Sequence, residues 1–202
     1  YEENVIRRNI GVVADALGFE VSDREILAKA PCFAAQPRPD LLASDRQNIA
    51  FVIGASWPSK EYPKERFTEL ALDLDEARCI LIWGSERERA YADFIAKNAP
   101  NAVVAPKLSL SGLRAVIEHC DLTIGNDTGP THLAWAMNRP SITLFGPTNT
   151  RMIYETPINL ACESDSKVDI RKIDKNDFSI RTIPVEAIAE KARRLLEAEQ
   201  TC

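Results

Sequence analysis

The 202-residue sequence lacks the features that mark membrane-spanning, exported and nucleic-acid-binding proteins. No apolar run approaches the roughly 18 residues that a membrane-spanning helix needs, and the first residues, Tyr1 to Asn4, do not resemble a signal peptide. The formal net charge of -5 gives no general affinity for nucleic acid. We therefore expect a soluble, cytoplasmic chain that binds no nucleic acid.

Metal-binding and disulfide frameworks are also missing. The five cysteines are widely separated, and no C-x-x-C pair occurs among them, so we expect reduced thiols. The two histidines, His119 and His132, are too few and too scattered among the carboxylates to indicate a metal site. Hydrophobic residues at 45% and charged residues at 27% are ordinary for a globular domain.

From about residue 48 onward, short apolar runs alternate with stretches that have helical spacing. Such alternation predicts an α/β fold with a parallel sheet covered by helices on both faces. The predicted strands are 49–53, 79–83, 103–104, 122–124 and 142–145, and the predicted helices are about 64–75, 86–98, 109–119 and 130–138. Residues 163–181 are charged and lack periodicity, which predicts an exposed loop. Pro184 then opens a last amphipathic helix.

The segment before this pattern has a different organisation. An amphipathic helix is predicted from Val5 to Leu17, with Val5, Ile6, Ile10, Val13 and Leu17 on one side and Gly18 as its stop. The proline-rich stretch Pro31 to Pro39 and the polar run that follows it are typical of a linker.

The stretch from Cys120 to Met137 is the one around which the chain is organised. A short apolar run ends at Gly125 and a helical pattern starts after Gly129, which predicts a strand, a turn and a helix. The free N–H groups at such a helix start bind phosphate well. Asp127, Thr128 and Gly129 would then face the ligand. The alternative is an ordinary helix entry in which Asp127 or Thr128 caps the free N–H groups.

Two blocks decide between these alternatives. Residues 127–136, DTGPTHLAWA, and residues 140–148, PSITLFGPT, resemble the donor-binding signature of glycosyltransferase family 9, the ADP-heptose:lipopolysaccharide heptosyltransferases. The resemblance runs from about Asn48 to Thr148. It implies that residues 48–202 form the Rossmann-like donor domain, the C-terminal half of a GT-B glycosyltransferase fold. It also implies that residues 1–47 are the end of an N-terminal acceptor domain plus a linker.

The resemblance assigns further residues to the donor. The turn after the first strand carries Ser56, Ser59 and Lys60, which the family pattern places at the phosphates, although a lone lysine in such a turn is more often solvated. After the second strand, Glu88, with Glu86 as the alternative, would accept hydrogen bonds from ribose hydroxyls. Alternatively, both glutamates would be solvated in the first turn of a helix. His132 receives a binding role near the phosphates.

The resemblance therefore predicts an inverting, metal-independent glycosyltransferase without cofactor. The donor would be ADP-heptose and the acceptor the Kdo sugars on lipid A, reached at the inner face of the cytoplasmic membrane through the N-terminal domain. The catalytic base is expected in that domain, so we expect no catalytic residue in this chain and no activity from the chain alone. The region after Thr148 holds only Cys162, without the cysteine cluster of second heptosyltransferases, and this favours the first enzyme.

Other interpretations remain open from the residues. The chain could be a non-catalytic nucleotide-binding domain, a family 9 transferase of another sugar, or part of a sugar-nucleotide epimerase. If Asp127 contacts the sugar, Asp127→Asn is expected to lower transfer at least tenfold and to leave the melting temperature almost unchanged, because asparagine caps nearly as well as aspartate.

Overall fold

The computed structural model describes residues 4–31, 33–169 and 171–199. Its centre is one parallel sheet with the strand order β3-β2-β1-β4-β5-β6. The strands are β1 (Asn48–Val52), β2 (Arg78–Ile82), β3 (Ala102–Val104), β4 (Leu122–Asn126), β5 (Ser141–Phe145) and β6 (Asn159–Glu163). This is the order of the Rossmann fold, so the predicted α/β class is confirmed.

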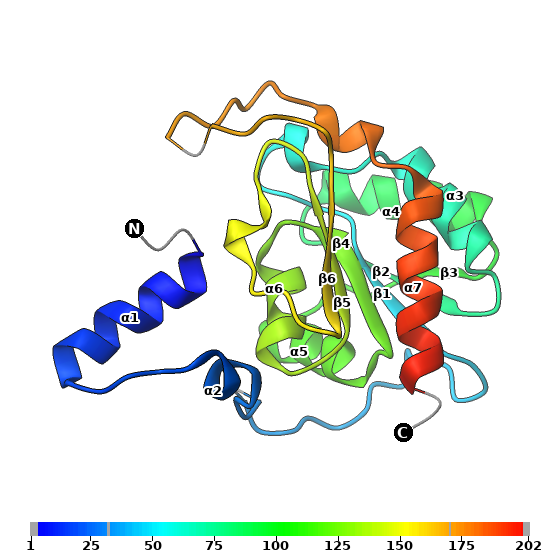
Figure 1. Ribbon diagram of the computed structural model, residues 1–202. Helices are drawn as coiled ribbons and strands as arrows, with labels where there is room; N and C mark the ends of the chain where they lie inside the picture. The colour runs from blue at the N-terminus through cyan, green and yellow to red at the C-terminus, as the bar shows by residue number, and fades with distance from the viewer. Residues whose placement is uncertain (1–3, 32, 170, 200–202) are drawn as a thin grey trace.

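Helices cover both faces of this sheet (Figure 1). The face with α3 (Lys64–Asp73), α4 (Glu86–Asn98) and α7 (Val185–Glu199) packs one apolar cluster, and the face with α5 (Leu110–His119) and α6 (Gly129–Ala136) packs another. Short 3-10 helices occur at η1 (Pro58–Lys60), η2 (Thr150–Met152) and η3 (Ser179–Thr182).

The strand β1 shows how the sequence builds the two layers. Ile49, Phe51 and Ile53 point to the α3, α4 and α7 side, and Ala50 and Val52 point to the α5 and α6 side, as the two-residue period of a strand requires. All of these side chains are buried. A strand buried on both faces needs a continuous apolar run, which is why the sequence pattern located it.

Besides the short 3-10 helices, one strand and one α-helix escaped prediction. The edge strand β6 (Asn159–Glu163) has only the three apolar residues Leu160, Ala161 and Cys162 between two polar ends, so its apolar run is short. The short helix α2 (Asp23–Leu27) is set by a capping box of Ser22 and Glu25. The prediction of an exposed loop for residues 163–181 was wrong at its two ends, because Glu163 closes β6 and Ile180, in η3, is fully buried.

The N-terminal helices lie apart from the sheet in Figure 1, at the lower left. The helix α1 (Val5–Leu17) is present as predicted, but its apolar side is only partly covered: Ile6 and Ile10 are half-buried, whereas Val13 is 52% exposed and Leu17 is 71% exposed. The segment is tied to the sheet domain by polar contacts, in which the Asn4 amide donates to the Ile153 carbonyl at 2.6 Å and Lys29 donates to the Trp135 carbonyl at 2.6 Å.

The remaining sequence predictions concern thiols and membranes. Cys79, Cys120 and Cys162 are free and buried, as expected, and burial raises the pKa of each thiol. Cys32 and Cys202 lie outside the described residues. In the part of the chain that the structure describes, no helix has the length and apolar character to span a bilayer.

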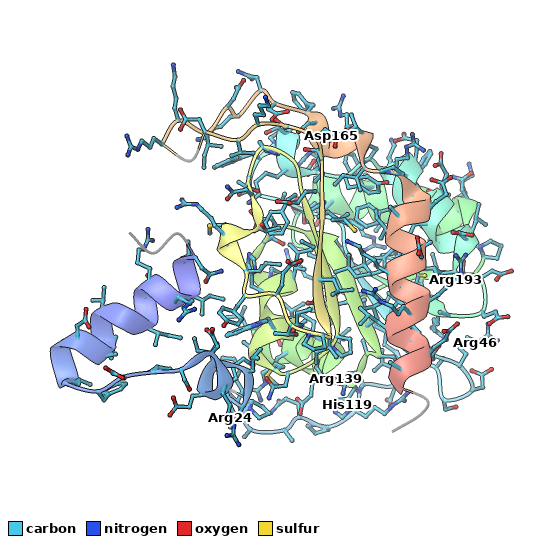
Figure 2. All side chains as sticks on the ribbon, in the orientation of Figure 1. Arg24, Arg46, His119, Arg139, Asp165 and Arg193 are labelled. Atoms are coloured by element: carbon cyan, nitrogen blue, oxygen red, sulfur yellow. The ribbon has the colours of Figure 1, made fainter. Side chains whose placement is uncertain are left out.

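The two ends of the sheet carry different labelled residues in Figure 2. Figure 2 shows Arg46, His119 and Arg139 at the end where the strands begin, and Asp165 at the opposite end, after β6. Ligands of open parallel sheets bind outside the carboxyl ends of the strands, on the Asp165 side. His119 and Arg139 are therefore far from the expected site.

Candidate functional site

A cavity of about 640 Å³ opens at the carboxyl ends of β1, β2 and β4. Its volume falls within the range of roughly 300–1,000 Å³ that is usual for small-molecule sites. We call it the carboxyl-end cavity. It is lined by residues from the turns that follow these three strands, by the start of α5 and by one residue of η2: Val52, Gly54, Ala55, Ser56, Lys60, Ile82, Trp83, Gly84, Glu88, Leu108, Leu113, Asp127, Thr128, Gly129, Pro130, His132 and Met152.

A charged cluster centred on Asp127 forms one wall of the carboxyl-end cavity. The Lys60 ammonium lies 2.6 Å from Asp127 Oδ2, and the Thr148 hydroxyl donates to the same oxygen at 2.8 Å. His132 Nε2 lies 2.8 Å from Asp127 Oδ1, and because a carboxylate only accepts hydrogen bonds, Nε2 carries the proton. The four side chains come from the turn after β4, from η1, from α6 and from the turn after β5, so the fold assembles them.

The electrostatics of Asp127 follow from these contacts. Burial favours the neutral acid and raises the pKa of the Asp127 carboxyl. The hydrogen bonds from His132 and Lys60, the charge of Lys60 and the hydrogen bond from Thr148 outweigh burial and lower the pKa to about 2. Asp127 is therefore ionised at neutral pH, and its side chain is only 3% exposed.

The helix-cap interpretation of the signature is wrong for Asp127 and for Thr128. Thr128 occupies the N-cap position of α6, but among the described residues no side chain makes a capping hydrogen bond to the free N–H groups of this helix. The Asp127 oxygens are engaged by Lys60, His132 and Thr148 instead. The free N–H groups at the start of α6 thus stay available to an anion, beside the open space around Gly129.

The predicted donor ligands in the turn after β1 differ in their access to the cavity. Ser56 and Lys60 line the carboxyl-end cavity, whereas Ser59 is fully buried and does not line it. Ser59 lies in η1, whose tight winding turns its hydroxyl inward, where it has no hydrogen-bond partner among the described residues. The structure thus gives the Ser59 side chain no access to a ligand in the carboxyl-end cavity.

Glu88, in the first turn of α4, lines the cavity, and Glu86 does not. Ser85 and Glu88 form the capping box of α4, in which Glu88 Oε2 accepts from the N–H of Gly84 at 2.7 Å and of Ser85 at 3.2 Å. The carboxylate also packs against Gly54, where an added Cβ would lie 2.3 Å from Glu88. The capping box therefore fixes a carboxylate at the cavity wall.

An apolar wall, whose residues are not among the predicted donor ligands, completes the carboxyl-end cavity. Ile82, Trp83, Leu108 and Leu113 line it, and Trp83 is fixed by a hydrogen bond from Nε1 to the Ala105 carbonyl at 2.7 Å. These residues follow β2 and β3 or begin α5, so the alternating pattern could have located them. A flat heterocyclic ring suits such a wall. Among the described residues, no group of three or more His, Cys, Asp or Glu side chains is placed to hold a metal ion.

Comparisons with known proteins agree with this geometry. The family model described as "Glycosyltransferase family 9 (heptosyltransferase)" matches residues 1–168. Lipopolysaccharide heptosyltransferase 1 of Campylobacter coli is 34% identical over 219 residues, which cover 98% of this chain and 63% of that protein. Lipopolysaccharide heptosyltransferase 1 of Pseudomonas aeruginosa is 39% identical over 103 residues, or 50% of this chain and 29% of that protein.

Solved structures match the fold. The structure of Escherichia coli heptosyltransferase WaaC with ADP gives a TM-score of 0.70 at 22% identity, covering 96% of this chain and 57% of that one. E. coli ADP-heptose lps heptosyltransferase II gives a TM-score of 0.64 at 23% identity, covering 90% of this chain and 54% of that one. These matches confirm the predicted Rossmann-like part of a GT-B glycosyltransferase fold. The chain spans less than two thirds of the length of these relatives.

Proposed function

The chain belongs to glycosyltransferase family 9, and we propose that it forms the donor-binding part of an inverting heptosyltransferase of lipopolysaccharide core synthesis. The donor is ADP-heptose, and the acceptor is the Kdo region of lipid A. The first heptosyltransferase is favoured over the second, because the two cysteines after Thr148, Cys162 and Cys202, form no closely spaced cluster and the Campylobacter coli relative carries that name.

One observation carries the proposal: a buried ionic cluster and an uncapped helix start lie on one side of a cavity whose other side is apolar. A nucleoside diphosphate has the same division, with two phosphates at one end and a flat apolar base at the other. We place the diphosphate between Lys60 and the start of α6, where positive charge and free N–H groups converge. The base then lies against Leu108 and Leu113.

The remaining wall suits the ribose. Glu88 Oε2 is occupied by backbone N–H groups of the capping box, which hold the carboxylate in one orientation. Its other oxygen, Oε1, can accept hydrogen bonds from ribose hydroxyls, as acidic residues after a strand do in dinucleotide folds. Ser56, which is exposed in the same cavity, can donate to a phosphate oxygen.

The chemistry that these residues supply concerns the leaving group. When the bond between the anomeric carbon and the phosphate oxygen breaks, negative charge develops on ADP. Lys60 and the N-terminal end of α6 stabilise that charge, and His132, which is fixed by Asp127, lies beside them. The proposal assigns no cofactor to this step, and it places the general base that accepts the proton of the attacking hydroxyl in the acceptor-binding part of the enzyme.

The helix α1 exposes an apolar surface that another part of the enzyme can cover. Val12, Val13 and Leu17 on α1 are 66%, 52% and 71% exposed, which is a large apolar area for one short helix. We propose that residues 1–47 are the end of the acceptor-binding domain plus the linker, and that this apolar side packs within that domain. The acceptor is then reached at the inner face of the cytoplasmic membrane.

Calorimetric titration of the chain with ADP-heptose tests the proposal, with ADP and UDP-glucose as comparisons. We expect ADP and ADP-heptose to bind and UDP-glucose to bind at least tenfold more weakly, because the smaller, more polar uracil ring covers less of the apolar wall than adenine does. A folded chain that binds neither adenine nucleotide at millimolar concentration would contradict the proposal. Equal affinity for ADP and ADP-heptose, with no sugar transfer by the native enzyme, would favour a non-catalytic nucleotide-binding domain.

A further inference from the structure

Asn126, the last residue of β4, is completely buried and lies next to Asp127 in the chain. Its side-chain oxygen accepts the N–H of Tyr62 at 3.0 Å. Its side-chain nitrogen donates to the carbonyls of Ile53 at 2.9 Å and Gly54 at 3.2 Å. Both N–H groups of the amide are therefore used, and no water is needed to satisfy them.

These partners lie at the two ends of one turn. Ile53 and Gly54 are where the chain leaves β1, and Tyr62 is where it returns to begin α3. The β1–β4 ladder stops at the pair Val52 and Gly125, so the next carbonyls of β1 have lost their strand partner. The Asn126 amide takes the place of that partner and closes the turn, which we call the Lys60 turn (residues 54–62).

The Lys60 turn and α6 are thereby both fixed to residues 126 and 127. Asp127 pairs with the Lys60 ammonium at 2.6 Å, and the Asn126 carbonyl accepts the Thr131 hydroxyl of α6 at 2.7 Å. Lys60 and the start of α6 are the two groups that face the diphosphate in the proposed function. The buried Asn126 amide therefore holds the Lys60 side of this pair, and the main-chain carbonyl of the same residue holds α6.

We propose that Asn126 is a positioning residue for the phosphate-binding half of the carboxyl-end cavity. It touches no ligand and acts through the Lys60 turn. The inference rests on the proposed function for the identity of the ligand, but the hydrogen bonds that carry it belong to the chain itself. Aspartate cannot replace it, because a carboxylate has no N–H groups for the two carbonyls.

The chain offers a matched control in Asn48. This asparagine is also buried, its oxygen accepts the Ala43 N–H at 2.7 Å, and its nitrogen donates to the carbonyls of Ala43 at 3.0 Å and Arg46 at 3.2 Å. It lies at the first residue of β1, at the end of the sheet opposite the carboxyl-end cavity. The two amides make the same kind and number of hydrogen bonds, and only Asn126 is connected to the Lys60 turn.

The experiment compares Asn126→Ala with Asn48→Ala in binding ADP and adenosine, by calorimetry or ligand-observed NMR. We expect both variants to lose similar thermal stability, while ADP affinity falls about tenfold or more only in Asn126→Ala, since loosening Lys60 costs charge-assisted bonds to phosphate. Adenosine affinity should change less than twofold in either variant. An equal loss of ADP and adenosine affinity, or an equal loss of ADP affinity in Asn48→Ala, would overturn the proposal.

A second measurement needs no ligand. Hydrogen–deuterium exchange of residues 54–62 should become at least tenfold faster in Asn126→Ala and stay unchanged in Asn48→Ala, and unchanged exchange in both would refute the positioning role. Failure of the unaltered chain to bind ADP would count against the proposed function alone. If Asn126→Ala does not fold, Asn126→Ser and Asn48→Ser replace the alanine pair, because the serine hydroxyl retains one donor for the carbonyls.

Discussion

Asp127→Asn removes one negative charge from the ionic cluster and leaves a side chain of nearly the same size. In the folded protein the pKa of Asp127 falls from an ordinary 3.8 to about 2. Each pKa unit corresponds to about 1.4 kcal/mol, so the ionised carboxylate stabilises the folded state by roughly 2 kcal/mol. Asparagine supplies no charge, and the Lys60 ammonium, 11% exposed, is left without its counter-charge.

We therefore expect Asp127→Asn to lower the free energy of unfolding by about 2 kcal/mol at pH 7 and the melting temperature by roughly 4–8 °C. This differs from the sequence-based expectation of an almost unchanged melting temperature, which treated Asp127 as a ligand or a cap. The difference arises because the structure buries the carboxylate among Lys60, His132 and Thr148.

The contribution of Asp127 to the free energy of unfolding depends on pH in a defined direction. The pKa of Asp127 is lowered by folding, so its contribution is present above the unfolded value near pH 4 and is lost as the pH falls toward 2. Urea unfolding of the chain and of the variant between pH 7 and pH 3 should show a difference of about 2 kcal/mol that starts to shrink below pH 4.

Two controls separate the cluster from general effects of charge. Asp93→Asn removes an exposed partner of Arg89 and should change stability by less than about 0.5 kcal/mol. In Lys60→Met, Asp127→Asn should cost clearly less than it does in the unaltered chain, since its counter-charge is already absent. A difference that does not vary with pH, or costs that simply add in the double variant, would refute the reasoning.

Three further substitutions test the surroundings of the cluster. Lys60→Met should weaken ADP binding by about 1–3 kcal/mol without weakening adenosine binding, as calorimetry can show. Gly54→Ala places a Cβ 2.3 Å from the Glu88 carboxyl, so we expect this carboxyl to move, the capping box of α4 to open at a cost of about 1 kcal/mol and adenosine affinity to fall several-fold, and an unchanged affinity would separate Glu88 from the ribose. Tyr62→Phe leaves the Ile183 carbonyl without its 2.8 Å hydrogen bond and should cost about 1–2 kcal/mol in urea unfolding.

The central part of the fold was predictable because burial on both faces leaves a clear pattern. The strands from β1 to β5 and the inner face of α7, with Val185 and Ile188, follow apolar runs or helical spacing, and the structure confirms them. The edge strand β6 was missed because its short apolar run, residues 160–162, lies between the polar residues Asn159 and Glu163. The exposure of Val13 and Leu17 could not be predicted from the sequence either. An apolar stripe shows that one side of a helix can be buried, but not which part of the protein buries it.

The sequence predicted which residues form the candidate site, but not which of them contact one another. The strand-turn-helix pattern and the family resemblance singled out Lys60, Asp127 and His132, and the structure brings these three together. The contact between Lys60 and Asp127 depends on the register of β1 against β4, which no local pattern encodes. The inward orientation of Ser59 depends on the winding of η1 and was missed for the same reason.

Mapping of ADP binding by NMR tests the central claim most directly, because it reports whether the carboxyl-end cavity is the nucleotide site. Amide signals should be followed in the isotope-labelled chain as ADP is added. We expect the perturbed signals to fall in residues 54–60, 83–88 and 128–132, with those of Arg46 and His119, at the opposite end of the sheet, unchanged. Perturbations centred on the opposite end, or none at millimolar ADP, would contradict the account.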